Sequence, residues 1–525
     1  MSPISRRGFG KSLLSTVMLP AALPGSALSS ESAAAGRPNI VFIVCDQHSG
    51  RYLGLNGFPL VQTPNLNRLA ARGVNFQNCY SNNPVCVPAR ASLMTGMFAS
   101  DVDSFGNATP LGPDKPTWGN RLRSQGYYCW ATGKMDLTHG ADYGFHEVEV
   151  SNGHSRNPDI TSLFRAPVCM YLPERPQVSG WFRDYQSRDA ERARRALQFL
   201  RNEAPKLRQP WAAYVGFTMP HPRWIAQRKY VDTYPPGKMP LPVVPLSYLD
   251  ERPEPFTLLA NFHNVSAPIS RKRVQRARAA YFGMISELDE HVGSLLDELD
   301  RSGESENTLI IYTSDHGEML GENGLWFKDV LLENAARVPL IMAGAGLPQG
   351  KTITTPVSHV DMVSTMLDIA GVPRPAELRG HSLVPLVHGQ GGAKPEFAFS
   401  ESHSTGNITG SFMIRKGDWK YIYFTGDKPL LFNLKDDPGE LNNLGEKPEM
   451  AGLVHELHQH LNSLVDPDAV TYRAFDRQHQ ILMNMVNSLD AESFYKRLLS
   501  RMGPAQSRVL TYKLYKEKAA QKSLS

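Results

Sequence analysis

The chain has 525 residues, of which 41% are hydrophobic and 20% are charged. This length exceeds what one ordinary hydrophobic core can organise, so two domains are expected. The formal net charge is only +5, and the basic residues are scattered along the chain rather than gathered in a stripe. This pattern argues against a nucleic-acid-binding protein and leaves open a local basic cleft for an anionic substrate.

The N-terminus has the pattern of an export signal. Paired arginines within SRRGFGK (residues 5–11) precede a short apolar run over residues 13–23, and small residues follow. This order is typical of the twin-arginine signal, which carries folded proteins across a membrane. The run is too short to act as a stable membrane anchor. We expect residues 1–35 to be removed after passage through the twin-arginine translocase, leaving a periplasmic or secreted bacterial protein.

Three continuous apolar segments predict buried strands. They are NIVFIVCDQ (39–47), WAAYVGFTMPHP (211–222) and NTLIIYTSDHGE (307–318). Runs without alternation are typical of parallel strands that are covered on both faces, and amphipathic segments at 187–202 and 279–299 predict helices between them. The strands end in polar residues. Since ligands bind beyond the carboxyl ends of such strands, we expect one crevice to contain Asp46, Gln47, His221, Asp315 and His316.

The acids at two of these strand ends predict a metal site. Asp46 and Asp315 supply carboxylates and Gln47 supplies an amide oxygen, a set that suits calcium, magnesium or manganese. A nitrogen ligand from His316 would make calcium less favourable and manganese more so. Taken singly, each of these residues also has an ordinary explanation as a loop residue or a helix cap.

A second unusual stretch is NPVCVPARASLMTG, residues 83–96, in which Cys86 stands between two prolines. The chain has five cysteines and no Cys-x-x-Cys pair, so it is neither a disulfide scaffold nor a zinc or redox motif protein. Half of a disulfide, a metal ligand, a buried filler and a nucleophile all remain open for Cys86.

The segment Cys86-Val87-Pro88-Ala89-Arg90, followed by Leu-Met-Thr-Gly, resembles the Cys-x-Pro-x-Arg element of the type I sulfatases. In that family a formylglycine-generating enzyme oxidises the cysteine to formylglycine. Further similarities are Gly133-Lys134, Pro220-His221-Pro222, Lys328 and the stretches GDWKYIYF and LFNLKDDPGELNNL, so the resemblance covers about residues 37–445. Within the family, GKMDLTHG (133–140), VGFTMPHP and AYFGMISELD are most similar to arylsulfatase K, the glucuronate 2-sulfatase type.

The resemblance implies a fold and a division into domains. The fold would be an alkaline-phosphatase-like α/β sandwich with a large, mostly parallel sheet, plus a smaller C-terminal α+β domain with a short antiparallel sheet. We expect a catalytic domain over 36–392, a C-terminal subdomain over 393–465 and a helical extension over 466–525. The extension has a charged amphipathic pattern, which predicts helices that pack on the domain or form oligomer contacts.

The resemblance also implies a mechanism. Formylglycine at position 86 would form a gem-diol that attacks sulfur. One divalent metal ion, calcium before manganese or magnesium, would be held by Asp46, Gln47, position 86, Asp315 and His316. Most sulfatases have aspartate at position 47 and asparagine at position 316. The sulfate charge would be neutralised by three cations, Arg90, Lys134 and Lys328. The leaving alcohol would be protonated by His221.

Position 136 departs from the family, because a histidine that assists sulfate release is replaced there by Asp136. Either Asp136 or nearby His139 takes over its role. His48, Glu318 and His359 are expected to have supporting or packing roles.

The substrate implied is a sulfated carbohydrate. The arylsulfatase K likeness points to a uronic acid 2-sulfate, whose carboxylate Arg156 or Arg165 would meet. One alternative is a phosphodiesterase or phosphonate monoester hydrolase of the same fold. Another is a non-catalytic binder of sulfated polysaccharide in which Cys86 stays a thiol.

Overall fold

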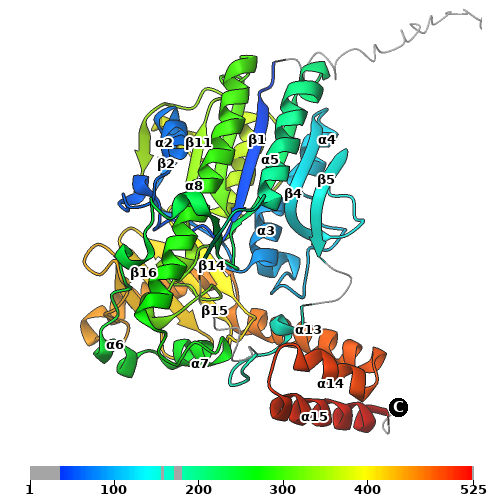
Figure 1. Ribbon diagram of the computed structural model, residues 1–525, viewed down its shortest axis with the longest axis vertical. Coiled ribbons are helices and arrows are strands. Elements are labelled where there is room, and N and C mark those ends of the chain that lie inside the picture. The colour runs from blue at the N-terminus through cyan, green and yellow to red at the C-terminus, as the bar shows by residue number, and fades with distance from the viewer. Residues whose placement is uncertain (1–35, 155–158, 171–179, 523–525) are drawn as a thin grey trace, which may run out of the picture.

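An eight-stranded sheet forms the centre of the protein (Figure 1). The structure is a computed structural model that describes residues 36–154, 159–170 and 180–522. The expected export signal (1–35) and Arg156 therefore lie outside the described residues. The strands, in chain order, are β1 (Asn39–Asp46), β2 (Gly73–Phe76), β4 (Tyr128–Thr138), β5 (Glu147–His154), β7 (Trp211–Pro220), β9 (Thr308–Ser314), β11 (Leu340–Ala343) and β12 (Lys351–Ile353).

The sheet is mostly parallel, with the strand order β12-β2-β11-β9-β1-β7-β4-β5. The neighbours β9, β1, β7, β4 and β5 all run in the same direction. Only β11 runs against its two neighbours. The three strands predicted from apolar runs are therefore β9, β1 and β7, which lie side by side.

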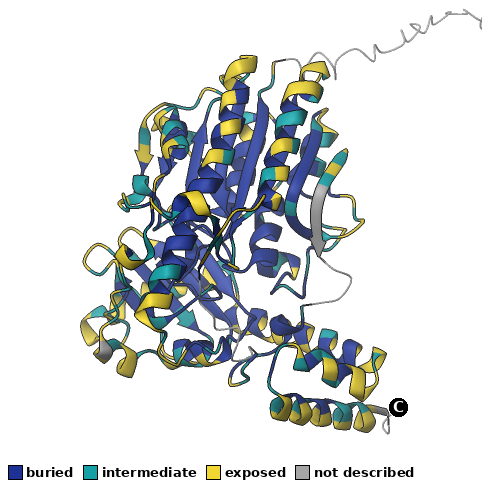
Figure 2. Ribbon diagram, viewed as in Figure 1, coloured by how far each residue is buried: buried dark blue, intermediate teal, exposed yellow. Residues whose placement is uncertain are grey.

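The buried pattern of β1 explains its continuous apolar sequence. All eight of its residues are buried. Val41, Ile43 and Cys45 face one hydrophobic core, and the alternate side chains face another. A strand that contributes to two cores cannot alternate apolar with polar residues. Figure 2 shows the central strands of the sheet as buried, with exposed residues on the outer faces of the covering helices.

Helices cover both faces of the sheet. On the front face in Figure 1, α5 (Arg188–Gln198) and the long α8 (Arg271–Ser302) pack together with α2 (Pro64–Ala71). On the other face lie α3 (Cys86–Thr95), α4 (Trp118–Ser124) and α10 (His359–Ile369). The predicted helices at 187–202 and 279–299 correspond to α5 and to part of α8.

A second, antiparallel sheet has the order β14-β15-β16-β17. Its strands are β14 (Ala398–Ser402), β15 (Ser411–Lys416), β16 (Trp419–Phe424) and β17 (Leu430–Asn433). Helix α12 (Ala451–Leu464) packs against this sheet. These two sheets with their helices are the alkaline-phosphatase-like architecture that the sequence predicted, including the short antiparallel sheet.

The remaining C-terminal residues form three helices, α13 (Pro467–Ser488), α14 (Ala491–Leu499) and α15 (Pro504–Lys522). They share a hydrophobic core with Ile160, Leu163 and Phe262, which lie earlier in the chain. The predicted helical extension therefore packs back on the protein, and Figure 1 shows it projecting from the lower edge.

The shorter elements connect these layers. The strands are β3 (Cys79–Tyr80), β6 (Trp181–Arg183), β8 (Ile225–Gln227), β10 (Arg337–Val338) and β13 (Val357–Ser358), and the helices are α6 (Leu246–Glu251), α7 (Glu254–Phe262), α9 (Glu333–Ala336) and α11 (Val384–His388). Among the described residues, no helix has both the length and the apolar character that crossing a membrane requires. None of the five cysteines forms a disulfide.

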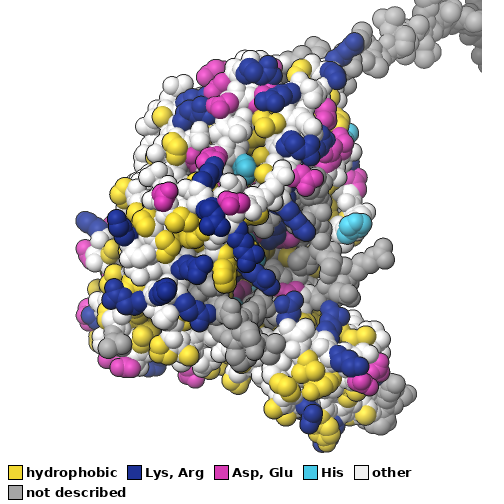
Figure 3. Space-filling model, in the orientation of Figure 1, with side chains coloured by type: hydrophobic (Ala, Val, Ile, Leu, Met, Phe, Trp, Pro, Cys, Tyr) yellow, Lys and Arg dark blue, Asp and Glu magenta, His cyan; other side chains and the backbone are white. Residues whose placement is uncertain are grey.

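The surface carries charges of both signs. Figure 3 shows lysine and arginine side chains distributed over one face of the molecule, with acidic side chains among them. Exposed ion pairs such as Lys229 with Glu290 are part of this surface. The face in view therefore has the scattered basic residues that the sequence indicated.

Candidate active site

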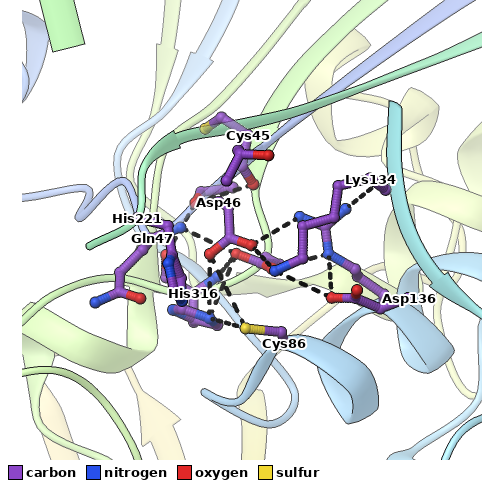
Figure 4. Close-up of polar contacts among 12 residues, drawn as sticks. Cys45, Asp46, Gln47, Cys86, Lys134, Asp136, His221 and His316 are labelled. Atoms are coloured by element: carbon purple, nitrogen blue, oxygen red, sulfur yellow. Dashed lines mark hydrogen bonds and ion pairs between the residues drawn. The ribbon is translucent and has the colours of Figure 1, made fainter. Parts of the chain in front are cut away.

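Four adjacent parallel strands bring the candidate residues to one edge of the sheet. Asp46 ends β1, and Asp315 and His316 follow β9. His221 follows β7, and Lys134 lies near the end of β4. Because these strands are neighbours in the order β9-β1-β7-β4, their carboxyl ends meet in one place, and we call this region between the strand ends the crevice. Figure 4 shows Asp46, Lys134 and His316 pointing toward one another from these elements, with Cys86 beside them.

Four buried groups in this crevice have the spacing of a metal site. Ligand atoms of Asp46, Cys86, Asp315 and His316 lie within 4.8 Å of one another. The Nδ1 atom of His316 is 3.0 Å from the carbonyl oxygen of Gly317. A proton shared in that contact leaves Nε2 as the electron-pair donor, and Nε2 faces the cluster.

Gln47 supplies a further oxygen from an unusual backbone conformation. Its φ of 73° lies in the left-handed region, which is uncommon for a residue with a side chain and clusters at functional sites. Its N–H donates to Asp315 Oδ1 at 3.1 Å, and its carbonyl accepts from Tyr281 Oη at 2.7 Å. The Oε1 atom accepts from Lys328 Nζ at 2.9 Å.

The donor set fits a divalent cation. Two carboxylates and an imidazole nitrogen lie close together in a buried space, and the buried amide of Gln47 is joined to them through its N–H and Lys328; each is a known ligand type for such ions. Burial and the neighbouring Asp46 carboxylate raise the pKa of Asp315. Burial would also raise the pKa of Asp46, but Lys134, His221, Lys328 and Arg90 together hold it well below its usual range. Two carboxylates that share a site in this way are stabilised by a cation between them.

Cys86 is the first residue of α3, whose ten residues are all buried. Its Sγ lies 3.2 Å from His316 Nε2 and 2.9 Å from Lys328 Nζ. Burial and Asp46 raise the pKa of the Cys86 thiol, but Lys134, Lys328 and His316 outweigh them and place it well below its usual range. The helix N-terminus adds partial positive charge at the same point.

Arg90 and Lys134 form the cationic side of the crevice. Arg90 lies one helical turn after Cys86, and its Nε is 2.9 Å from Asp315 Oδ2. Its guanidinium also donates to Tyr214 Oη at 2.7 Å and to the Lys134 carbonyl at 2.6 Å. Lys134 Nζ pairs with Asp46 and lies 3.1 Å from Asp136. Burial lowers the pKa of Lys134, but Asp136, Asp46 and Cys86 raise it well above its usual value.

The turn after β7 carries His221. Its N–H donates to the Thr218 carbonyl at 2.9 Å, and its Nδ1 is 2.6 Å from the Pro222 carbonyl. Buried Asp189, at the start of α5, accepts from the Thr218 and Met219 N–H groups, the latter at 2.7 Å. The α5 helix therefore holds the turn that aims the imidazole.

Asp136 and His139, the two candidates for the role of the family histidine, lie in different surroundings. Asp136 is buried, has a φ of 54° and lies 3.6 Å from Arg90 Nε, within the crevice. His139 is exposed in the turn after β4. Arg165, suggested as a partner for a substrate carboxylate, instead binds protein oxygens, since it donates to the carbonyls of His403 and Asn407 at 2.6 and 2.9 Å.

The structure adds residues that no motif indicated. Tyr214 binds Arg90, Tyr281 binds the Gln47 backbone, and Asp189 holds the His221 turn. Asp189 had no signal in the sequence, because an acid in the first turn of a helix is ordinary.

A hydrolase of anionic esters is the class that this fold and crevice define, because carboxylates and cations converge beside a buried Cys86. Comparison with known proteins is more specific. The family model described as Sulfatase matches residues 38–372, and the model described as N-sulphoglucosamine sulphohydrolase, C-terminal, matches residues 321–466. The chain belongs to the sulfatase family and is a sulfuric ester hydrolase.

Individual relatives agree with this assignment. The chain is 36% identical over 436 residues to a choline-sulfatase of Rhizobium meliloti (79% of this chain, 83% of the relative). It is 31% identical over 467 residues to human arylsulfatase K (82% and 83%), which confirms the local likeness seen in the sequence. Among solved structures, a phosphonate monoester hydrolase from Silicibacter pomeroyi superposes with a TM-score of 0.68 at 27% identity, over 81% of this chain and 95% of that one.

Proposed function

We propose that this sulfatase hydrolyses the sulfate esters of a carbohydrate and that Cys86, oxidised to formylglycine, supplies the nucleophile. The observation that carries the proposal is the position of Cys86. Its Sγ lies 2.9 Å from Lys328 Nζ and 3.2 Å from His316 Nε2, within a buried group of two carboxylates. A residue that only filled the core would need none of these charged neighbours.

The chemistry at position 86 depends on its oxidised form. In the hydrated aldehyde, one hydroxyl of the gem-diol attacks sulfur, and the second later allows the sulfate to be expelled without attack by water. The surrounding residues serve this role through charge. Lys328 and the N-terminus of α3 stabilise a negative oxygen at position 86.

One divalent cation would be held by Asp46, Gln47, Asp315, His316 and the oxygen that replaces Sγ at position 86. Calcium is our first candidate, with manganese or magnesium as alternatives. When bound, such an ion supplies positive charge that polarises the sulfate and lowers the pKa of the attacking hydroxyl. The left-handed backbone of Gln47 and the hydrogen bond from its N–H to Asp315 fix the positions of these two ligands relative to each other.

Arg90, Lys134 and Lys328 bind the sulfate oxygens and stabilise the charge that develops on them. Lys134 reaches the crevice from β4, while Arg90 is fixed by Asp315 and Tyr214. Asp136 pairs with Lys134 and Arg90, so it orients both cations and takes the place of the family histidine.

His221 donates a proton to the oxygen of the leaving alcohol. The contact of Nδ1–H with the Pro222 carbonyl fixes the ring, and in the imidazolium form Nε2 carries the second proton, which is the one transferred. An alkoxide of a sugar is a poor leaving group, so proton donation is essential for a carbohydrate sulfate.

The carbohydrate substrate is supported by the arylsulfatase K likeness and by the match to the N-sulphoglucosamine sulphohydrolase model. A uronic acid 2-sulfate is the first compound class to test. Choline sulfate is a necessary comparison because of the choline-sulfatase relative. Activity on choline sulfate alone would refute the carbohydrate assignment.

Two measurements test the chemistry. Mass spectrometry of the residue 83–96 peptide from the native host should show a mass lower than that of cysteine, as formylglycine requires. Cys86→Ala should abolish sulfate-ester hydrolysis while the melting temperature stays close to that of the unchanged protein. Retained turnover in Cys86→Ala would refute the nucleophile.

The phosphonate monoester hydrolase likeness supports a second activity to compare. Matched aryl sulfate and aryl phosphonate esters should show higher kcat/KM for the sulfate.

We also propose that residues 1–35 direct twin-arginine export to the periplasm and that residues 36–392, 393–465 and 466–525 are the domains. Replacement of both arginines of the signal by lysine should leave the protein in the cytoplasmic fraction.

A further inference from the structure

The carboxamide of Gln47 has two ends that face different partners. Its Nε2 donates to Glu318 Oε2, and its Oε1 accepts from Lys328 Nζ at 2.9 Å. An amide can rotate by half a turn and exchange these ends. The partner on the Nε2 side therefore decides whether an oxygen or an NH2 group faces the metal-capable group.

Glu318 is fully buried, and its carboxylate accepts hydrogen bonds from three N–H donors. Its Oε1 accepts from the backbone N–H of Leu320 at 2.8 Å and of Phe327 at 2.7 Å. Its Oε2 accepts from Gln47. A carboxylate offers only acceptors, so it fits this set completely and leaves one orientation for the Gln47 amide.

The Glu318 carboxylate also holds the loop that leads to Lys328. Leu320 and Phe327 lie at the two ends of a loop, and the Met319 N–H donates to the Phe327 carbonyl at 2.7 Å. Phe327 directly precedes Lys328, whose Nζ contacts both Gln47 and Cys86. Glu318 thus fixes the amide and the lysine relative to each other.

We propose that Glu318 is a positioning residue that holds the Gln47 oxygen toward the metal site, and that residues 47 and 318 form one unit with a single negative charge. A carboxylate of the same length at position 47 would face buried Glu318, and two adjacent buried carboxylates repel each other. The inference rests on the proposed function, because it assumes that Gln47 is a metal ligand.

The structure specifies a nearly isosteric test. In Glu318→Gln, the side-chain oxygen can keep both backbone hydrogen bonds, while its new NH2 group faces the NH2 group of Gln47. The Gln47 amide should then rotate and present NH2 to the metal and to Lys328. In the double variant Gln47→Glu with Glu318→Gln, the carboxylate at position 47 accepts from the new amide at position 318 and again turns an oxygen inward.

The measurement is the melting temperature of chelator-treated protein during titration with MnCl2 and, separately, CaCl2. Glu318→Gln should raise the metal concentration at the midpoint by about tenfold or more, as loss of a ligand-orienting partner typically does. The double variant should recover most of that affinity. Glu322→Gln is the matched control, since Glu322 lies in the same loop and pairs with Arg278.

Unchanged metal affinity in Glu318→Gln would overturn the inference. So would a double variant that is no better than Glu318→Gln, because a general loss of fold or charge would not be reversed by moving the carboxylate. The titration needs no turnover. It therefore separates this inference from the nucleophile proposal, which is tested by the activity of Cys86→Ala and by the mass of the residue 83–96 peptide.

Discussion

Lys328 Nζ lies 2.9 Å from Cys86 Sγ, and both side chains are buried at the N-terminus of α3. The ammonium group also donates to Gln47 Oε1 at 2.9 Å. Burial lowers the pKa of Lys328, but Cys86 and Asp46 raise it above its usual value, so the lysine stays charged. A fixed cation at the reacting atom has direct consequences for catalysis.

Lys328→Met should therefore reduce kcat/KM for an aryl sulfate by about a hundredfold or more, the size typical for one group that stabilises developing charge. Lys328→Arg is the matched comparison, because it keeps the charge but changes its geometry. Steady-state kinetics and melting temperatures of both variants check this. Equal activity of Lys328→Met and the unchanged enzyme would exclude a role in the chemical step.

Removal of divalent metal should lower both activity and stability. Without a cation, Asp46 and Asp315 face each other in a buried site, and only the surrounding cations offset their repulsion. Treatment with a chelator should therefore lower the melting temperature, and added metal should restore it. In Asp46→Ala with Asp315→Ala, added metal should no longer change the melting temperature.

Asp189→Asn should impair the use of poor leaving groups. Its Oδ2 accepts from both the Thr218 and the Met219 N–H groups, and its Oδ1 pairs with buried Arg192. The NH2 group of asparagine would therefore face either that guanidinium or those two N–H groups. Displacement of the proton donor should leave kcat/KM for 4-nitrophenyl sulfate almost unchanged, because its leaving group needs little protonation. For a sugar sulfate, kcat/KM should fall by about tenfold or more. The ratio of kcat/KM for the two substrates measures the effect. Asp184→Asn, at an exposed ion pair with Arg228, should leave the ratio unchanged.

Asp361 should make the stability of the protein depend on pH. Burial raises its pKa to about 7, although the N–H groups of Ser358 and His381 donate to it. The folded protein then binds a proton that the unfolded chain releases near pH 4. Stability should fall as pH rises from about 4 to 7, by at most about 1.4 kcal/mol per unit.

The check is urea denaturation at pH 5 and pH 7.5, repeated for Asp361→Asn. Asparagine cannot ionise, so the variant should lose much of the decrease with pH. An identical pH dependence in both proteins would show that Asp361 is not its source.

The sequence predicted the site best where a candidate ligand stands at the end of an apolar strand. Asp46 and Asp315 end continuous apolar runs, so their meeting at one edge followed from the parallel arrangement alone. Lys134 was placed only through the family resemblance, because nothing in its neighbourhood reveals that β4 lies beside β7. The sequence could not show which of Asp136 and His139 lies beside Lys134, because the positive φ of Asp136 is a property of the folded strand end.

Supporting residues were the hardest to foresee. Glu318 was expected to have a supporting or packing role, and its actual contacts join Gln47 to a loop that returns several residues later. Asp189 acts across the interface between α5 and β7. Such contacts depend on how the helices and loops pack against the sheet. The local pattern of the sequence does not determine this packing.

The complete burial of α3 imposes an order of events on biosynthesis. Cys86 is 5% exposed, and every other residue of its helix is buried as well. A modifying enzyme would not reach this segment once it has docked, so the proposed oxidation of Cys86 would have to precede the folding of the nascent chain. Slower folding, for instance in cooler cultures, should enlarge the active fraction of a preparation while the turnover number per oxidised molecule stays constant.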